Sequence, residues 1–174
     1  MAYRKKISYI WQDSIGSLSR RMGVGSLLAD AYKIHNLKDR DLKMEANRLL
    51  KLVGLPAQIS ERYPHQLSGG QARRVGVARA ISLDPKLIIA DEPTAGLDVS
   101  VQGEILNLLN KLRDDLGVSL FVITHNLNIV RHISDITAVM YLGRFVEQGQ
   151  TDDIFANPRH PYTLALLSAN LTPY

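Results

Sequence analysis

The chain has 174 residues, of which 45% are hydrophobic and 22% charged, so its composition is globular and excludes a disordered tail or a fibre. It contains no Cys, which excludes disulfides, thiolate metal sites and Cys nucleophiles. The net charge of +4 is compatible with nucleic acid, an acidic membrane surface or a phosphate ligand, and equally with an ordinary solvated surface. No apolar run approaches the ~18 residues of a membrane span, and the first residues resemble no secretory signal, so we expect a cytosolic chain.

The first half of the sequence predicts one strand followed by helices. The sequence begins with β-forming residues, continues with polar residues and then shows apolar residues at helical spacing. Gly54 and Pro56 mark the end of the helical pattern. In order, we expect a strand over 7–11, a loop over 12–21, helical structure from 24 to 53, a short segment over 59–66, a glycine turn at 67–71 and a helix over 71–83.

The second half predicts strands that alternate with helices, which is typical of a parallel α/β sheet. Two strands are short and apolar throughout, as expected for strands buried on both faces. In order, we expect a buried strand over 87–90, a helix over 99–116 closed by Gly117, a buried strand over 118–124, a short helix over 127–132, strands over 137–141 and 144–148 joined at Leu142-Gly143, and a tail from 151 with a helix over 162–169.

Two acidic side chains, Asp91 and Glu92, follow the predicted buried strand. In an open parallel sheet, ligands bind at the carboxyl ends of the strands. Adjacent carboxylates are costly to bury alone, and a hard cation relieves that cost: Asp91 can hold Mg²⁺ through water while Glu92 orients or deprotonates an attacking water. The alternative is a turn at the end of the strand that carries two solvated acids.

The glycine turn at 67–71 reads Leu-Ser-Gly-Gly-Gln and opens a helix. Its glycines allow the backbone to approach a ligand, and the N–H groups of a helix N-terminus suit a phosphate, with Ser68 as a further donor. The alternative assigns Ser68 to the helix N-cap and the glycines to the turn itself.

Three more polar residues stand at the ends of predicted elements. His125 follows a strand and can reach the same crevice, although an isolated His is commonly structural or exposed. Gln12 follows the first strand and can touch Mg²⁺ or water. Asp98 precedes the helix over 99–116, where we expect an N-cap role whatever else it does.

Taken together and in this order, these residues resemble the ATPase subunit of an ABC transporter. The spacings of 20 positions from Gln71 to Asp91 and 33 from Glu92 to His125 agree with that family. The motifs that carry the resemblance are LSGGQ at 67–71 (the signature), LIIADE at 87–92 (Walker B), PTAGLDVS at 93–100 (the D-loop), Trp11-Gln12-Asp13 (the Q-loop) and His125 (the switch histidine).

The end of the chain narrows the resemblance. The segment NPRHPYTLALLSA at 157–169 resembles the importer branch for oligopeptides, dipeptides and nickel. The loop over 14–21 departs from the proline-containing version usual in that branch. In the family this loop meets the membrane subunit, so the departure falls on the segment that couples the two subunits.

The resemblance implies a role for each matching residue, with ATP and Mg²⁺ as cofactors. It implies a second ATPase subunit and membrane-spanning permease subunits as partners, no nucleic acid, and a peripheral location on the cytoplasmic face of the inner membrane. The implied roles are Asp91 for the Mg²⁺ shell, Glu92 for polarising water, His125 for the γ-phosphate, Gln12 for sensing Mg²⁺ and the γ-phosphate, Ser68, Gly69, Gly70 and Gln71 for ATP held by the opposite subunit, and Asp98 across the dimer interface.

The phosphate-binding loop G-x-x-x-x-G-K-[ST] does not occur in the sequence, where no Gly is followed by Lys. We therefore expect an α/β fold with a partial P-loop NTPase core, an ABC helical subdomain and a short tail. Residues 1–150 would be the last two thirds of an ABC nucleotide-binding domain, with the helical subdomain at about 21–85 and core elements at about 1–20 and 86–150. Residues 151–174 would be the tail.

Such a chain would expose a sheet edge and apolar helix faces, and by itself would bind MgATP poorly and hydrolyse it negligibly. A partner chain that supplies the missing loop is one alternative. An ABC-type ATPase acting on nucleic acid or ribosomes, and an inactive truncated product, are the others.

Overall fold

The structure is a computed structural model that describes residues 5–13, 16–37 and 40–171. The chain forms two compact units, one up to Ile123 and the other from Thr124 onward. Each is described by itself below. The boundary predicted at residue 150, between the nucleotide-binding domain and the tail, rests on the family resemblance. It is not tested by this division into units and stays a prediction. Within the described residues, no helix combines the length and the apolar character needed to cross a bilayer.

The first unit contains a parallel sheet of three strands, in the order β1 (Ile7–Ile10), β2 (Leu87–Asp91) and β3 (Ser119–Ile123). Ile10 pairs with Ala90, which pairs with Val122. The predicted parallel α/β arrangement is confirmed. Parallel strands need crossover connections, and here helices supply them.

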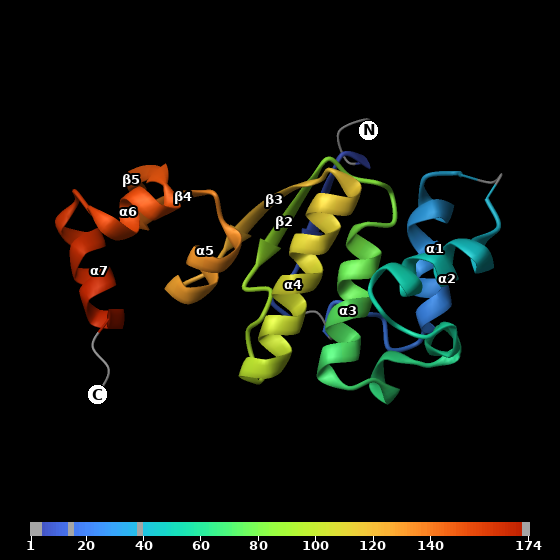
Figure 1. Cartoon of the computed structure of the whole chain (residues 1–174). Helices are drawn as coiled ribbons and strands as arrows, with labels where there is room; N and C mark the ends of the chain where they lie inside the picture. The colour runs from blue at the N-terminus through green and yellow to red at the C-terminus, as the bar shows by residue number, and fades with distance from the viewer. Residues whose placement is uncertain (1–4, 14–15, 38–39, 172–174) are drawn as a thin grey trace. The chain divides into compact units, whose positions relative to one another are not determined.

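Two helices, α3 (Gly69–Ala80) and α4 (Val99–Leu116), lie side by side, and α3 packs against β1 (Figure 1). The helix over 99–116 is confirmed at both ends. The other predicted helix begins two residues earlier than expected, because Ser68 caps it, and ends at Ala80 rather than at residue 83. The side chains of Ile88 and Ala90 are fully buried.

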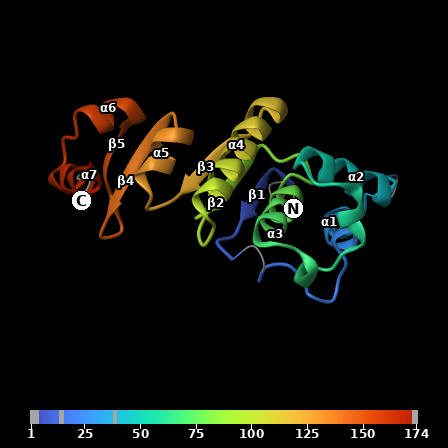
Figure 2. The same cartoon turned by 60° about the horizontal axis from the view of Figure 1, so that its bottom comes forward.

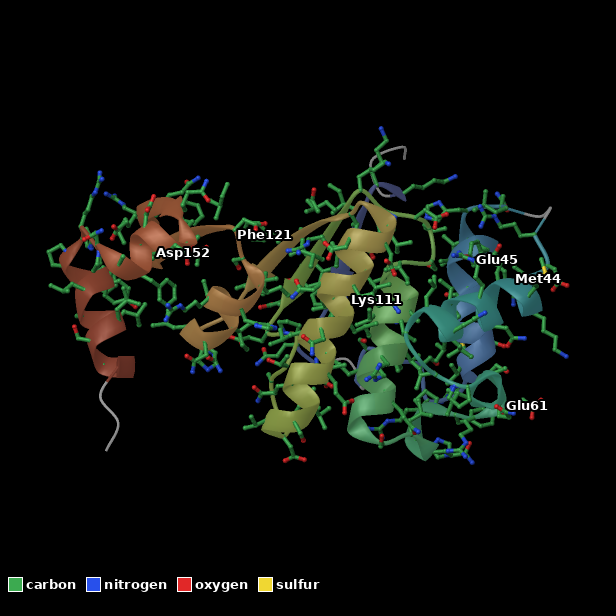
Figure 3. All side chains as sticks on the ribbon, viewed as in Figure 1. Met44, Glu45, Glu61, Lys111, Phe121 and Asp152 are labelled. Carbon is green, nitrogen blue, oxygen red and sulfur yellow. The ribbon has the colours of Figure 1, made fainter. Side chains whose placement is uncertain are left out.

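The opposite face of this sheet is less buried, so the prediction of two strands buried on both faces is wrong. Leu87 and Ile89 keep partial exposure, whereas Phe121 and Ile123 are 52% and 44% exposed. Phe121 is labelled on β3 in Figure 3. Successive side chains of a strand point to opposite faces, so burial alternates along β2 and β3 as it does when one face is covered.

The helical region of the first unit lies on the far side of α3 from the strands (Figures 1 and 2). The predicted helical structure from 24 to 53 is two helices, α1 (Val24–Ile34) and α2 (Leu42–Leu52). The break begins at Asn36, whose φ of 53° is left-handed, and ends at Asp41, whose carboxylate accepts hydrogen bonds from the backbone of Lys43 and Met44. Two short 3₁₀ turns, η2 (Ala57–Glu61) and η3 (Pro64–Gln66), lead from α2 to Ser68.

The second unit begins with α5 (Leu127–Ile133) and a hairpin of β4 (Ile136–Tyr141) and β5 (Arg144–Gln150). The strands are antiparallel, and Leu142 and Gly143 both have positive φ at the turn, as a tight hairpin requires. Two helices follow, α6 (Thr151–Ala156) and α7 (Pro161–Leu171). The sequence predicted only the second of them, because six residues are too few to show a helical period.

Candidate functional site

A pocket of about 410 Å³ lies in the first unit, between the start of α3 and the segment that leads into α4. It brings together residues that are 30 positions apart in the sequence: Ser68 with its glycines, and Asp98. The residues that line it are Leu55, Ser68, Gly69, Gly70, Gln71, Arg74, Gly96, Leu97, Asp98, Val101 and Glu104.

Ser68 is the N-cap of α3 and forms a reciprocal capping box with Gln71. Its Oγ accepts a hydrogen bond from the Gln71 backbone N–H at 3.2 Å, and the Gln71 Oε1 accepts one from the Ser68 N–H at 3.2 Å. The N-cap alternative for Ser68 is therefore confirmed. The cap does not use the whole hydrogen-bonding capacity of the hydroxyl, because an oxygen that accepts this bond still carries its own O–H to donate to a ligand.

Two glycines shape the pocket wall. A Cβ at Gly70 would lie 3.2 Å from Cγ1 of Val101 on α4, so the glycine permits the close approach of the two helices. Gly96 has a φ of +72°, which favours glycine, and it turns the chain after β2 toward Asp98. Both glycines line the pocket, and neither adds a side chain to it.

Asp98 occupies the N-cap position of α4, but its side chain makes no capping hydrogen bond. The expected N-cap contact is therefore wrong, although the residue stands at the helix start as predicted. Its exposed carboxylate lines the pocket instead. Across the pocket, Arg74 Nη2 donates to Glu104 Oε2 at 2.9 Å, and Arg74 Nη1 donates to the Val53 carbonyl at 2.9 Å.

Asp91 and Glu92 lie at the carboxyl end of β2, as predicted. The Tyr9 hydroxyl of β1 donates to Asp91 Oδ2 at 3.1 Å. Partial desolvation, together with the neighbouring Asp91 carboxylate, raises the pKa of Tyr9, so the phenol stays a donor at neutral pH. Glu92 has a left-handed φ of 44°, and its backbone N–H donates to the Ile123 carbonyl at 2.9 Å. Both acidic side chains are partly exposed.

These carboxylates fit the way in which nucleotide sites bind Mg²⁺. Mg²⁺ keeps several waters and takes one or two protein carboxylates together with substrate phosphates. The described residues include no group of three or more His, Asp or Glu side chains arranged to hold a metal without such a substrate. Asp91, a partly exposed carboxylate at a strand end, can serve as one of the few protein ligands that such a bound Mg²⁺ requires.

Gln12 follows β1 and has an exposed side chain, whereas its backbone carbonyl is held by a buried arginine. Arg73 Nη1 donates to the Gln12 carbonyl at 2.7 Å, and Nη2 donates to the Ala95 carbonyl at 2.8 Å. Residues 14 and 15 of the predicted loop over 12–21 lie outside the described residues.

His125 belongs to the second unit, in the segment that precedes α5, and its side chain is exposed. Its neighbour Asn126 caps α5 through a hydrogen bond from the Asn128 N–H at 3.0 Å.

The structure thus brings Ser68, Gly69, Gly70, Gln71 and Asp98 to one pocket, which Asp91, Glu92 and Gln12 of the same unit do not line. His125 belongs to the second unit. Two residues beside these sites were not expected, Tyr9 and Arg73. Their partners are 82 and 61 positions away in the sequence, beyond the reach of local pattern. Once strands 7–11 and 87–90 are taken as neighbours, the alternation along them places Tyr9 and Asp91 on the same face, and that signal identifies Tyr9.

Comparison with known proteins agrees with this architecture. Residues 1–95 match the ABC transporter family, and residues 146–173 match the C-terminal region of oligopeptide/dipeptide transporters. The chain is 46% identical to the dipeptide transport ATP-binding protein DppF of Haemophilus influenzae, over 95% of this chain and 51% of that protein. It is 45% identical to the oligopeptide transport ATP-binding protein OppF of Escherichia coli, over 97% and 51% respectively.

The chain spans about half the length of these curated relatives. Among solved structures it is similar to cbiO1 of Clostridium perfringens, described as part of the ABC transporter complex cbiONQ, with a TM-score of 0.76 and 30% identity over 88% of this chain and 61% of that one. It is also similar to the ATP-binding cassette MJ0796 bound to ADP and Pi, with a TM-score of 0.72 and 28% identity over 85% and 64%. The predicted fold and the family resemblance are confirmed, and the chain belongs to the ABC transporter family.

Proposed function

We propose that this chain is the nucleotide-binding part of an ATPase that drives an ABC importer for peptides. The observation that carries the proposal is the pocket shared by Ser68, Gly70 and Asp98, because it assembles two family motifs into one surface. The substrate class rests on the relatives named for dipeptide and oligopeptide transport and on the match over 146–173.

The pocket at α3 would bind the γ-phosphate of ATP held by a second ATPase subunit. The N–H groups of Gly69 and Gly70 lie in the first turn of α3, where the helix dipole favours an anion. The Ser68 hydroxyl adds a donor, and the capping box fixes its direction. Asp98, whose side chain makes no capping hydrogen bond to its own helix, would contact that second subunit.

The residues at the end of β2 would act on a nucleotide bound to the same chain. Asp91 would hold Mg²⁺, which supplies charge neutralisation for the phosphates when bound, and Tyr9 keeps the Asp91 carboxylate oriented. Glu92 would polarise the attacking water as the general base. Gln12 and His125 would contact the γ-phosphate side of this site, with Gln12 also near Mg²⁺.

This assignment makes two partners necessary, a second ATPase subunit and a membrane-spanning permease. ATP shared between two chains would drive closure of the dimer, since each subunit supplies part of the other's site. The permease would receive the resulting motion through the Gln12 loop. The chain would then work as a peripheral protein at the cytoplasmic face of the membrane.

The test compares the 174-residue chain with a longer chain that carries G-x-x-x-x-G-K-[ST] ahead of it. We expect steady ATP turnover from the longer chain and negligible turnover from the 174 residues alone, because that loop supplies the cradle and Lys for the β- and γ-phosphates. In the longer chain, Glu92→Gln is expected to lower kcat by ~100-fold or more, as loss of a general base does, while ATP binding persists.

The matched control is Glu61→Gln, an exposed carboxylate in η2, which should leave kcat unchanged. Steady turnover by the 174-residue chain would overturn the need for the missing loop. An equal loss of kcat in both variants, or a nucleic-acid affinity with a steep salt slope, would overturn the proposed function itself.

A further inference from the structure

Arg73 is a buried cation in the second turn of α3, with only 6% of its surface exposed. Among the described residues, its guanidinium donates hydrogen bonds to the backbone carbonyls of two segments. Nη1 donates to Gln12 at 2.7 Å and to Trp11 at 3.3 Å, and Nη2 donates to Ala95 at 2.8 Å. One planar side chain therefore binds two chain segments that are about eighty residues apart in the sequence.

Both segments carry residues of the candidate site. Trp11 and Gln12 follow β1, and Ala95 lies three residues before Asp98 in the segment after β2. Arg73 itself follows Ser68–Gln71 on α3. The guanidinium thus stands where the Gln12 segment, the Asp98 segment and the Ser68 helix meet.

Burial lowers the pKa of Arg73, and the charge of nearby Asp13 offsets part of that effect. An arginine stays protonated even so, because its ordinary pKa lies far above neutral pH. The fork of a guanidinium fixes two donor directions at once, which the single ammonium of a lysine does not do. A guanidinium at this position can therefore hold two segments in a fixed relative orientation through their backbone carbonyls.

We propose that Arg73 is a positioning residue that couples the Gln12 segment to the Asp98 segment, so that a displacement of one is transmitted to the other. The importance of this coupling for transport rests on the proposed function, in which Gln12 would face the permease side and Asp98 the second subunit. The coupling itself is a property of this chain.

A second arginine of α3 provides a variant that is expected to affect only one of the two segments. Arg79 Nη1 donates to the Ser17 carbonyl at 2.9 Å, and Nη2 donates to Ser17 Oγ at 3.2 Å. Arg79 thus holds the segment after β1, whereas the Ala95 carbonyl accepts its hydrogen bond from Arg73. Arg113, near the end of α4, serves as a control for loss of one positive charge.

Hydrogen exchange is the first readout, because both segments contain bonded amides. The Gly16 and Ser17 N–H groups bond to Asp13, and those of Ala95 and Leu97 bond to Glu92 and Thr94. We expect Arg73→Gln to speed exchange at both pairs by about tenfold, the effect of losing a charged hydrogen bond. Arg79→Gln should act at Gly16 and Ser17 alone, and Arg113→Gln at neither.

Fluorescence of Trp11, the single tryptophan of the chain, is the second readout. Gly96→Ala strains the Asp98 segment through its φ of +72° without a clash, since no atom lies within 4 Å of the added Cβ. We expect Gly96→Ala to change acrylamide quenching of Trp11 in the unaltered chain. The same change should have no effect in Arg73→Gln or in Arg73→Lys, which keeps the buried charge but not the fork.

An equal response of Trp11 to Gly96→Ala with and without Arg73 would overturn the coupling, and so would no response in either background. Faster exchange spread over α1 and α2 as well would show a general structural role and would also overturn it. These readouts need no nucleotide, so they stand or fall separately from the ATPase test.

Discussion

At the scale of single residues, Ser68 combines a structural and a proposed chemical role in one hydroxyl. Its oxygen accepts the Gln71 N–H and so caps α3, while its O–H remains a donor toward the pocket. The two interpretations of this residue that the sequence left open are therefore compatible. The same serine can cap α3 and, under the proposed function, donate a hydrogen bond to a phosphate in the pocket.

The two roles of Ser68 predict different outcomes for two substitutions. Ser68→Ala removes the cap and is expected to lower the free energy of unfolding by about 1 kcal/mol, measured in urea by circular dichroism. Ser68→Asp keeps a good N-cap and should leave that free energy nearly unchanged. It also replaces the donor with a negative charge, so in a longer, ATP-hydrolysing chain it should weaken ATP-dependent dimerisation.

Light scattering of the longer chain with and without ATP measures that dimerisation. If Ser68→Asp dimerises with ATP as well as the unaltered chain does, the hydroxyl has no contact with phosphate and only the cap remains.

At the scale of elements, a carboxylate joins α1 to α2. Glu45 of α2, labelled in Figure 3, accepts hydrogen bonds from the buried Tyr32 hydroxyl of α1 at 3.2 Å and from Arg48 Nε at 2.8 Å. Arg40 Nη1 donates to its other oxygen at 3.3 Å. The Glu45 side chain is 14% exposed. Desolvation raises the pKa of Glu45, but the Arg48, Tyr32 and Arg40 contacts outweigh it, and the net shift is downward.

A lowered carboxyl pKa in the folded state gives stability that is present above the ordinary Glu value and is lost as pH falls through the folded value. Glu45→Gln is therefore expected to destabilise the chain by about 1 kcal/mol at pH 7. The difference should shrink as the pH falls below the ordinary Glu range and through the lowered pKa of folded Glu45, because the carboxyl then becomes neutral like the Gln amide. Urea unfolding at a series of pH values measures it.

Glu61→Gln, on the exposed η2 turn, is the control and should show no such pH-dependent loss. A Glu45→Gln penalty that stays constant from pH 7 to the lowest pH would mean that packing, rather than the carboxylate charge, joins the two helices.

The elements themselves were largely predictable. The apolar period of α4, with glycine at its end, gave both boundaries, and the turn formers around β2 marked that strand. The break between α1 and α2 was missed because apolar residues continue on both sides of it. The Asp41 N-cap before Leu42 is the local signal that marks it in the sequence.

The candidate site was predictable to the extent that it is built from contiguous motifs. Ser68 with its glycines, and Asp91 with Glu92, stand out because turn and strand signals surround them. The pocket shared with Asp98, the Tyr9 contact and the Arg73 contacts depend on register and on packing between distant segments. Such contacts follow from the fold rather than from local pattern.

At the scale of the whole molecule, the sheet of the first unit has one face with an excess of exposed apolar surface. Register and alternation place Ile7, Tyr9, Ile89, Phe121 and Ile123 on this face. Ile7, Phe121 and Ile123 are 46%, 52% and 44% exposed. Tyr9, Ile89 and Phe121 are direct neighbours across the three strands, which distinguishes this patch from the scattered apolar residues of an ordinary surface.

A continuous patch of this kind binds apolar dyes and promotes association. We expect the 174-residue chain to bind an anilinonaphthalene dye and to self-associate as its concentration rises, and we expect Phe121→Ser to reduce both. Leu142→Ser is the matched control, because Leu142 is 84% exposed at the hairpin turn, away from the patch in sequence and on another sheet. Dye fluorescence and sedimentation measure the two effects. Equal losses of dye binding and self-association in both variants would mean that any exposed apolar side chain produces these effects. A loss confined to Phe121→Ser identifies the sheet face as the surface that binds the dye and self-associates.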